Sequence, residues 1–281
     1  MSEKAVVANA PEAKRREEQG PPVLREDANG VVRLTLNRPD SRNALSDAMI
    51  AALSLALDDI AGEPRVRAVV LAGAGPAFCA GHHLKELTGR RADPDKGAAY
   101  FLDLMRRCSA MMQKIVRLPQ PVIAAVEGVA SAAGCQLVAS CDLAVAGERA
   151  RFATPGVDIG LFCSTPMVAL SRNVASKHAM EMLLLGEFVD AREALRIGLV
   201  NRVVAEGSAI AEASALGRRI AAKPAATLRI GKRAFYEQRE MTLDEAYDYA
   251  AKVMADNLMI ADAEEGVGAF IEKREPRWEG G

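Results

Sequence analysis

The sequence lacks long apolar runs, paired cysteines and an excess of either charge. No stretch of about 18 uninterrupted apolar residues occurs in the 281-residue chain, so we expect no membrane-spanning helix. The five cysteines include no C-x-x-C pair, which disfavours a zinc site or disulfide framework and indicates free thiols in a reducing compartment. A formal net charge of −1 disfavours nucleic acid or an anionic membrane surface as the main partner.

The first 22 residues also lack an apolar segment. They contain the mixed charges of Arg15 to Glu18 and end in Gly-Pro-Pro, a composition typical of a disordered tail over residues 1–22. A secretory signal needs an apolar core, and an organelle transit peptide avoids acidic residues. We therefore expect neither signal, and we expect a cytoplasmic protein.

Hydrophobic residues make up 50% of the chain, which is enough for one large core. Short apolar runs predict buried strands at 31–36, 66–72, 121–126 and 141–146. Helical spacing lies between them, beginning at the expected N-cap Ser46 and again over 99–117. After Pro166 the pattern is mostly helical, with a capping box at Thr242 and another cap expected at Asp262. This alternation predicts an α/β fold.

A run of five small residues, 130–134, joins the predicted strand 121–126 to an apolar helix that runs towards Asp142. The first amides of a helix have no intrahelical partner, and the helix dipole is positive there. Small residues would let a ligand approach these amides closely, which suits a developing oxyanion. Close helix packing through small side chains explains the run equally well.

A second strand-to-helix turn has the same character. Ala80 and Gly81 follow the strand 66–72 and precede a predicted helix start. Two such turns, each offering a free N–H group, would form a two-donor pocket for a thioester carbonyl that gains negative charge.

These two segments, with Asn37-Arg38-Pro39 and Asn43-Ala44-Leu45 upstream, resemble the crotonase (enoyl-CoA hydratase/isomerase) superfamily over residues 23–278. Within it, residues 132–142, 152–156 and 160–166 look most like one subgroup, the third of the proteins called enoyl-CoA hydratase domain-containing proteins. The resemblance implies a crotonase-type ββα spiral core over 23–220. It also implies a C-terminal helical trimerisation region over 221–281, and hence a homotrimer or a dimer of trimers.

The resemblance assigns the oxyanion hole to two backbone amides, those of His82 and Ala133. Coenzyme A would enter as part of an acyl-CoA substrate, so no separate cofactor is expected. No metal is expected either, because His82 and His83 are neighbours in a turn and neighbouring side chains usually diverge. The positions that would contact the acyl or coenzyme A parts of the substrate are Arg42, Ala44, Ala80, His82, His83, Leu84, Lys85, Ala133, Phe270 and Lys273.

The sequence departs from the family at both catalytic acids. Hydratases of the family use two glutamates, and these positions hold Gln136 and Gly156 here. Gln is neutral and cannot accept a proton near neutral pH, although it can hold a water molecule. Asp158 could supply a carboxylate or anchor a turn, and His82 could act as a general base if its ring faces the acyl group.

We therefore expect an acyl-CoA-processing protein, an enoyl-CoA hydratase/isomerase-like enzyme with atypical acid and base residues. Its oxyanion hole would stabilise a thioester enolate. The alternative is a non-catalytic acyl-CoA-binding protein that has lost the acids.

Overall fold

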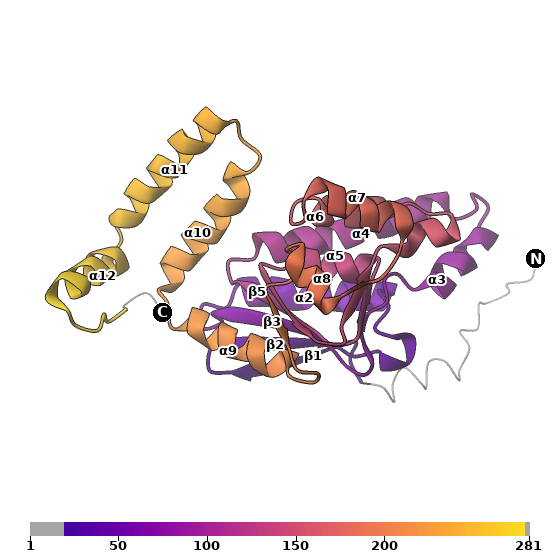
Figure 1. Ribbon diagram of the computed structural model, residues 1–281, viewed down its shortest axis with the longest axis horizontal. Helices are drawn as coiled ribbons and strands as arrows, with labels where there is room; N and C mark the ends of the chain where they lie inside the picture. Colours follow the sequence, from indigo (N-terminus) through magenta and orange to yellow (C-terminus); the bar gives the residue numbers. More distant parts are fainter. Residues whose placement is uncertain (1–19, 279–281) are drawn as a thin grey trace, which may run out of the picture.

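Residues 20–278 are described by the computed structural model, and they form two sheets surrounded by helices (Figure 1). The larger sheet, in spatial order, consists of β1 (Val23–Ala28), β2 (Val31–Leu36), β3 (Ala68–Gly73), β5 (Val122–Val126), β7 (Leu143–Gly147) and β10 (Arg202–Val204). The smaller one consists of β4 (Ala77–Cys79), β6 (Val129–Ser131), β8 (Arg151–Ala153) and β9 (Val189–Asp190). Only the pairs β1–β2 and β8–β9 are antiparallel among these strands. The predicted α/β class is confirmed.

Helices connect the strands and continue beyond them. They are α2 (Asp47–Ala61), α3 (Leu84–Gly89), α4 (Ala98–Arg117), α5 (Ala133–Ser140), α6 (Ser164–Leu170), α7 (Ser176–Leu185), α8 (Ala191–Arg196), α9 (Ala209–Ala221), α10 (Ala225–Gln238), α11 (Leu243–Leu258) and α12 (Ala261–Glu272). Short 3-10 helices lie at Pro39–Ser41, Arg90–Ala92 and Pro155–Ile159. Of the expected tail over 1–22, residues 1–19 lie outside the described part of the chain.

The strands of the larger sheet direct alternate side chains to opposite faces. In β3, Val69 and Leu71 join the large core that includes residues of α2, α4 and α5. The intervening residues Ala68 and Val70 join a smaller core with residues of α9. Because both faces of the sheet are covered, its parallel strands are apolar on both sides, as the continuous runs in the sequence predict.

Local signals place two of the three predicted helix starts correctly. The side chain of Ser46 accepts a hydrogen bond of 3.2 Å from the amide of Met49 and caps α2, as predicted. The capping box between Thr242 and Glu245 is also confirmed at the start of α11. The prediction of Asp262 as a cap is wrong, because Ile260 holds the extended N-cap conformation and Asp262 lies in the first turn of α12.

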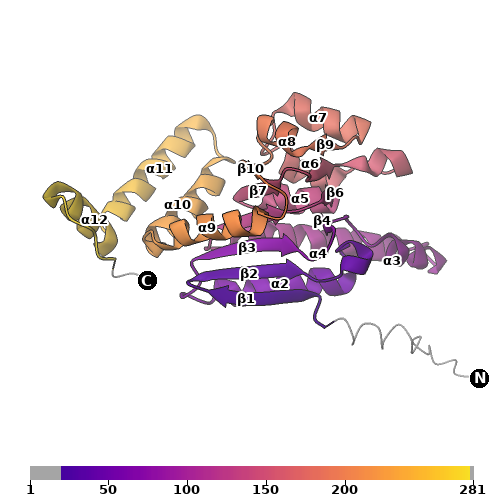
Figure 2. The same ribbon diagram turned by 60° about the horizontal axis from the view of Figure 1, so that its bottom comes forward.

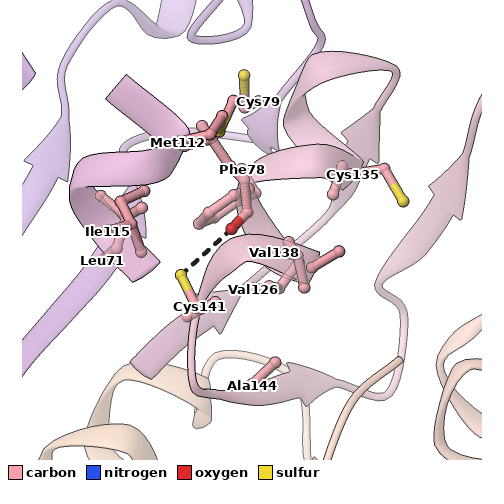
Figure 3. Close-up of a cluster of buried hydrophobic side chains, with 14 of the residues drawn as sticks. Leu71, Phe78, Cys79, Met112, Ile115, Val126, Cys135, Val138, Cys141 and Ala144 are labelled. Carbon is pink, nitrogen blue, oxygen red and sulfur yellow. Dashed lines mark hydrogen bonds between the residues drawn. The ribbon is translucent and has the colours of Figure 1, made fainter. Parts of the chain in front are cut away.

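Helix α5 lies in the middle of the large core, and all eight of its residues are buried. Figure 3 shows Cys135 and Val138 of this helix among apolar side chains of α4 and the strands. At its end, the Sγ of Cys141 donates a hydrogen bond of 3.2 Å to the carbonyl of Leu137.

Helices α10 to α12 form an arm that projects from the body of the molecule (Figures 1 and 2). We call this segment, Ala225–Glu272, the C-terminal arm. No residue of α10 or α11 is fully buried. Large apolar side chains are exposed along it, namely Phe235, Leu243, Tyr247, Met254, Leu258, Met259, Val267, Phe270 and Ile271.

Candidate active site

The two small-residue turns predicted from the sequence touch each other. Gly81 has a φ of +93°, and a Cβ atom built on it would lie 3.0 Å from the Cβ of Ala132 and 3.4 Å from the amide nitrogen of Ala133. Only glycine fits this close approach at this backbone conformation without strain. The turn after β4 therefore lies directly against the turn that opens α5.

The amide of His82 points towards the α5 side of this junction. Leu45 forms a parallel bridge with His82, in which the amide of Leu45 donates to Gly81 (2.7 Å) and the amide of His83 donates to Leu45 (3.2 Å). Because Leu45 uses both hydrogen bonds of this bridge, the N–H of His82 must point to the opposite side. On that side β4 pairs with β6, whose end leads into Ala133. Among the described residues, no acceptor binds the His82 amide.

The amide of Ala133 is similarly unpaired within residues 20–278, because Ala133 is the first residue of α5. The preceding Ala132 holds it in place, with its amide donating 2.9 Å to the carbonyl of Ala153 and its carbonyl accepting 3.0 Å from Gln136. Ala132 has φ 49° and ψ −115°, a conformation that an L-residue adopts at a cost of about 1–3 kcal/mol. The surrounding contacts thus impose the direction of the Ala133 amide.

The imidazole of His82 is half-buried, and neither ring nitrogen has a hydrogen-bond partner among the described residues. Burial lowers its pKa below the ordinary value. The ring is therefore uncharged at neutral pH. Directly bridged residues direct their side chains to the same face, so the ring lies on the side of the buried Leu45.

Gln136 is one helical turn from Ala133 on the same face of α5. Its side chain is 4% exposed, and its Oε1 atom has no hydrogen-bond partner within the described chain. A buried carboxamide oxygen without a donor is costly, and such groups often mark a functional site.

Gly156 lies in a position with no room for a side chain. A Cβ atom there would lie 2.4 Å from the carbonyl oxygen of Leu161 and 2.9 Å from the Sγ of Cys163. The loop is closed by a 2.8 Å hydrogen bond from the amide of Leu161 to the carbonyl of Gly156. Backbone atoms thus fill the space that a side chain at position 156 would need.

Asp158 lies against the end of α7. Its Oδ2 lies 3.1 Å from the point where a Cβ on Gly186 would stand, at the end of α7. The two cysteines beside the site are not activated: burial raises the pKa of Cys135 to about 12 and also raises that of Cys163. Neither thiol is a ready nucleophile near neutral pH.

The predicted coenzyme A positions divide into two groups. The first group lies together, because the amide of Ala80 donates 3.0 Å to the carbonyl of Arg42 and the 42–45 segment runs beside 80–83. Arg42, Leu84 and Lys85 are exposed at this junction, whereas Ala44 is buried. His83 caps α3, accepting a 3.4 Å bond from the amide of Glu86 at its Nδ1.

Phe270 and Lys273 form the second group. They lie at the end of the C-terminal arm, and α12 is far from α3 in both views of the chain (Figures 1 and 2). Within a single chain they are therefore not brought to the site. Phe270 is 86% exposed.

Neither a metal cluster nor a membrane span is present between Gly20 and Trp278. No three His, Cys, Asp or Glu side chains there converge as metal ligands would. No helix in that range combines the length and apolar character needed to cross a bilayer.

Sequence reasoning missed one buried polar cluster. Asp142, which follows α5, binds Lys232 (2.7 Å) and Tyr236 (2.9 Å) of α10. The sequence gives a weak signal for Asp142, an acid at the end of an apolar helix, and none for its partners some 90 residues later.

The chain resembles known proteins over nearly its whole length. The family model described as enoyl-CoA hydratase/isomerase matches residues 26–281. Human enoyl-CoA hydratase domain-containing protein 3, mitochondrial, is 43% identical over 266 residues, covering 95% of this chain and 86% of that protein. Its crystal structure superposes with a TM-score of 0.87 at 42% identity, covering 92% of this chain and 100% of the other.

A crystal structure described as an enoyl-CoA hydratase of Mycobacterium smegmatis is similar as well. It has a TM-score of 0.87 at 55% identity, covering 92% of this chain and 99% of that one. These comparisons confirm the family, the fold and the subgroup that the sequence motifs indicate.

The expected cytoplasmic location is contradicted by the same comparisons. The rat, Xenopus and human relatives, 43–44% identical, are all named mitochondrial, which points to mitochondria instead. The expectation rested on the composition of the first 22 residues, and composition is a weaker signal than likeness over 89–95% of the chain.

Proposed function

The chain belongs to the enoyl-CoA hydratase/isomerase family, and from this premise we propose that it binds an acyl-CoA thioester and stabilises an enolate of its acyl group. One observation carries the proposal: the amides of His82 and Ala133 are unpaired within residues 20–278 and belong to turns that touch. Two donors aimed at one carbonyl oxygen stabilise the charge that develops there, and each is worth about 2.7–4 kcal/mol in the transition state. The positive end of α5 adds to the effect.

The same site suggests which residues would hold the remainder of the substrate. Arg42 and Lys85 are exposed beside the junction and would bind the phosphates or ribose of coenzyme A. Coenzyme A is part of the substrate in this proposal, and no other cofactor is needed. Enolate stabilisation serves hydration, double-bond shift and thioester hydrolysis alike, so the amides do not select among them.

We propose that ordinary hydration is slow. A positioned acid or base contributes about 10²–10⁴ in rate, and neither Gln136 nor Gly156 can act as one near neutral pH. The crowding at Gly156 favours the second candidate function, an acyl-CoA-binding protein without catalysis, because backbone atoms fill the place of one acid.

The test is a panel of acyl-CoA thioesters, with calorimetric binding, loss of enoyl absorbance and release of free coenzyme A as separate measurements. The variant Ala133→Pro removes one amide donor at the first position of a helix, and circular dichroism checks that it folds, because proline also restricts the preceding Ala132. Ala133→Gly keeps the amide and serves as its control. We expect Ala133→Pro to lose about 10²–10³ in the turnover rate of any active thioester, with the control near wild type.

Each result decides between the candidates. Turnover of any panel member excludes the binding-only function. Tight binding without turnover supports it, and no binding of any thioester contradicts both. Hydration of crotonyl-CoA at the rate of a two-glutamate relative would contradict the proposed slow hydration.

We further propose that the protein forms a homotrimer, or a dimer of trimers, through residues 221–281. The exposed apolar side chains of the C-terminal arm support this, because monomers rarely expose contiguous apolar surface. In such an assembly Phe270 and Lys273 would reach the site of a neighbouring copy. Light scattering after size-exclusion chromatography tests the assembly, and a monomer at micromolar concentration would contradict it.

A further inference from the structure

Asp142 lies just beyond the carboxyl end of α5, where both of its carboxylate oxygens accept hydrogen bonds. Its Oδ2 accepts from the amide of Val122 (2.7 Å) and from the Nζ of Lys232 (2.7 Å), and its Oδ1 accepts from the hydroxyl of Tyr236 (2.9 Å). The ammonium of Lys232 also donates to the carbonyls of Ile115 (3.1 Å) and Gln120 (3.0 Å). All three of its donors are therefore used, and its side chain is only 7% exposed.

This cluster is a principal attachment of the C-terminal arm to the body of the protein. No residue of α10 is fully buried, and its apolar residues Ala226, Leu228 and Ile230 are only half-buried, so polar contacts carry more of its attachment than in most helices. Its other polar contacts with the body lie at the exposed end, where Arg239 binds the carbonyl of Arg172. Lys232 and Tyr236 thus provide the inner polar contacts of a helix that belongs to the projecting arm (Figure 1).

Helix α5 links this attachment to the candidate active site. Its eight residues span about 12 Å, with the Ala133 amide at one end and Asp142 just past the other. Its last turn is reinforced by the hydroxyl of Ser140, which donates to the carbonyl of Gln136 (2.8 Å). Because the helix is buried along its whole length, it has little freedom to bend, so a displacement of Asp142 would carry through to the amide end.

We infer that Asp142, Lys232 and Tyr236 are positioning residues that couple the seating of the C-terminal arm to the placement of the Ala133 amide. The inference rests on the proposed function in one respect, that this amide is an oxyanion donor. Any partner that binds the arm, including a second copy of the chain, would then change the position of the Ala133 amide without contacting the site.

Hydrogen–deuterium exchange of the full-length protein tests the coupling without any substrate. In Lys232→Met, which removes the charge but keeps the bulk, we expect exchange in residues 134–142 to rise by about tenfold or more. Exchange in β2 and β3 should stay as in wild type. The matched control is Lys252→Met, the same change on the same arm at an exposed pair with Asp256.

Tyr236→Phe removes a single hydrogen bond and keeps the inference testable if Lys232→Met does not fold. It should raise exchange over 134–142 by a smaller factor. Unchanged exchange there in both variants would overturn the coupling, because α5 then does not respond to the arm. An equal rise in β2 and β3 would overturn it as well, because the response is then a general destabilisation and not one of α5.

A second measurement uses a thioester that the wild type turns over. We expect Tyr236→Phe to lower kcat while leaving KM close to wild type, because the amide acts in the transition state. A change in KM with kcat unchanged would overturn the positioning role. If no thioester binds to the wild type, the proposed function fails, and the exchange experiment still decides whether the arm controls α5.

Discussion

Replacing Gly156 with alanine is the most direct test of how the site is built. The added Cβ would lie 2.4 Å from the carbonyl oxygen and 3.2 Å from the carbonyl carbon of Leu161, and 2.9 Å from the Sγ of Cys163. Comfortable contacts between nonbonded heavy atoms lie near 3.5–4.0 Å, so the closest approach is too short by about 1 Å. A backbone carbonyl cannot rotate away as a side chain can. The loop must therefore move.

The cost has two parts. Overpacking of a well-packed region costs about 1–3 kcal/mol. Moving the loop also breaks the 2.8 Å hydrogen bond from Leu161 to Gly156, worth about 0.5–1.5 kcal/mol. We expect Gly156→Ala to lower the free energy of unfolding by about 1.5–4.5 kcal/mol.

Urea unfolding followed by circular dichroism measures this change, with m-values compared to establish that the unfolding transition is the same. Gly89→Ala is the control, because no atom lies within 4 Å of a Cβ there and its φ is −57°. It should be neutral or stabilise by up to about 1 kcal/mol. A loss below about 0.5 kcal/mol in Gly156→Ala would refute the packing argument, since that is the range of ordinary surface substitutions.

Three further predictions follow from other parts of the chain. Ser46→Ala should destabilise by about 1 kcal/mol through loss of the α2 cap, measured by urea unfolding, whereas Ser54→Ala inside the same helix should not. Burial lowers the pKa of His82 from its ordinary 6.5, so the unfolded chain binds more protons in acid and the stability falls as the pH drops below about 6.5. His82 contributes at most about 1.4 kcal/mol per pH unit to this dependence of the unfolding free energy on pH. That contribution should vanish in His82→Gln and persist in the control His178→Gln. The same pH dependence in both variants would contradict the prediction. Gln136→Glu alone should raise the rate of crotonyl-CoA hydration, measured in a coupled absorbance assay, by up to about 10²–10⁴ if the new carboxylate is positioned. An unchanged rate would mean that the second acid is indispensable.

Much of the fold is predictable because its signals are local. The N-cap at Ser46 and the capping box at Thr242 each depend on residues within one helical turn. The failure at Asp262 shows the limit of such signals, since the same spacing also occurs when the cap is Ile260 and the acid lies in the first turn.

The candidate site is predictable only in part, for two physical reasons. Contacts between distant segments leave no local pattern, as with Lys232, which binds Asp142 across 90 residues. Steric crowding is also not evident from the sequence. The sequence shows only that Gly156 replaces an acid, whereas in the structure backbone atoms fill the space that a side chain there would need. Restoring a glutamate at 156 would therefore need a rebuilt loop as well as a new side chain.

At Ala132, the stability of the fold and the orientation of the Ala133 amide make opposite demands on the side chain. Glycine would adopt its backbone angles, φ 49° and ψ −115°, without the penalty that the alanine Cβ incurs. A search for thermostable variants should therefore recover Ala132→Gly early. The backbone hydrogen bonds to Ala153 and Gln136 would remain, but the greater freedom of glycine would loosen the following amide, so the more stable protein would bind the oxyanion of the proposed function less well.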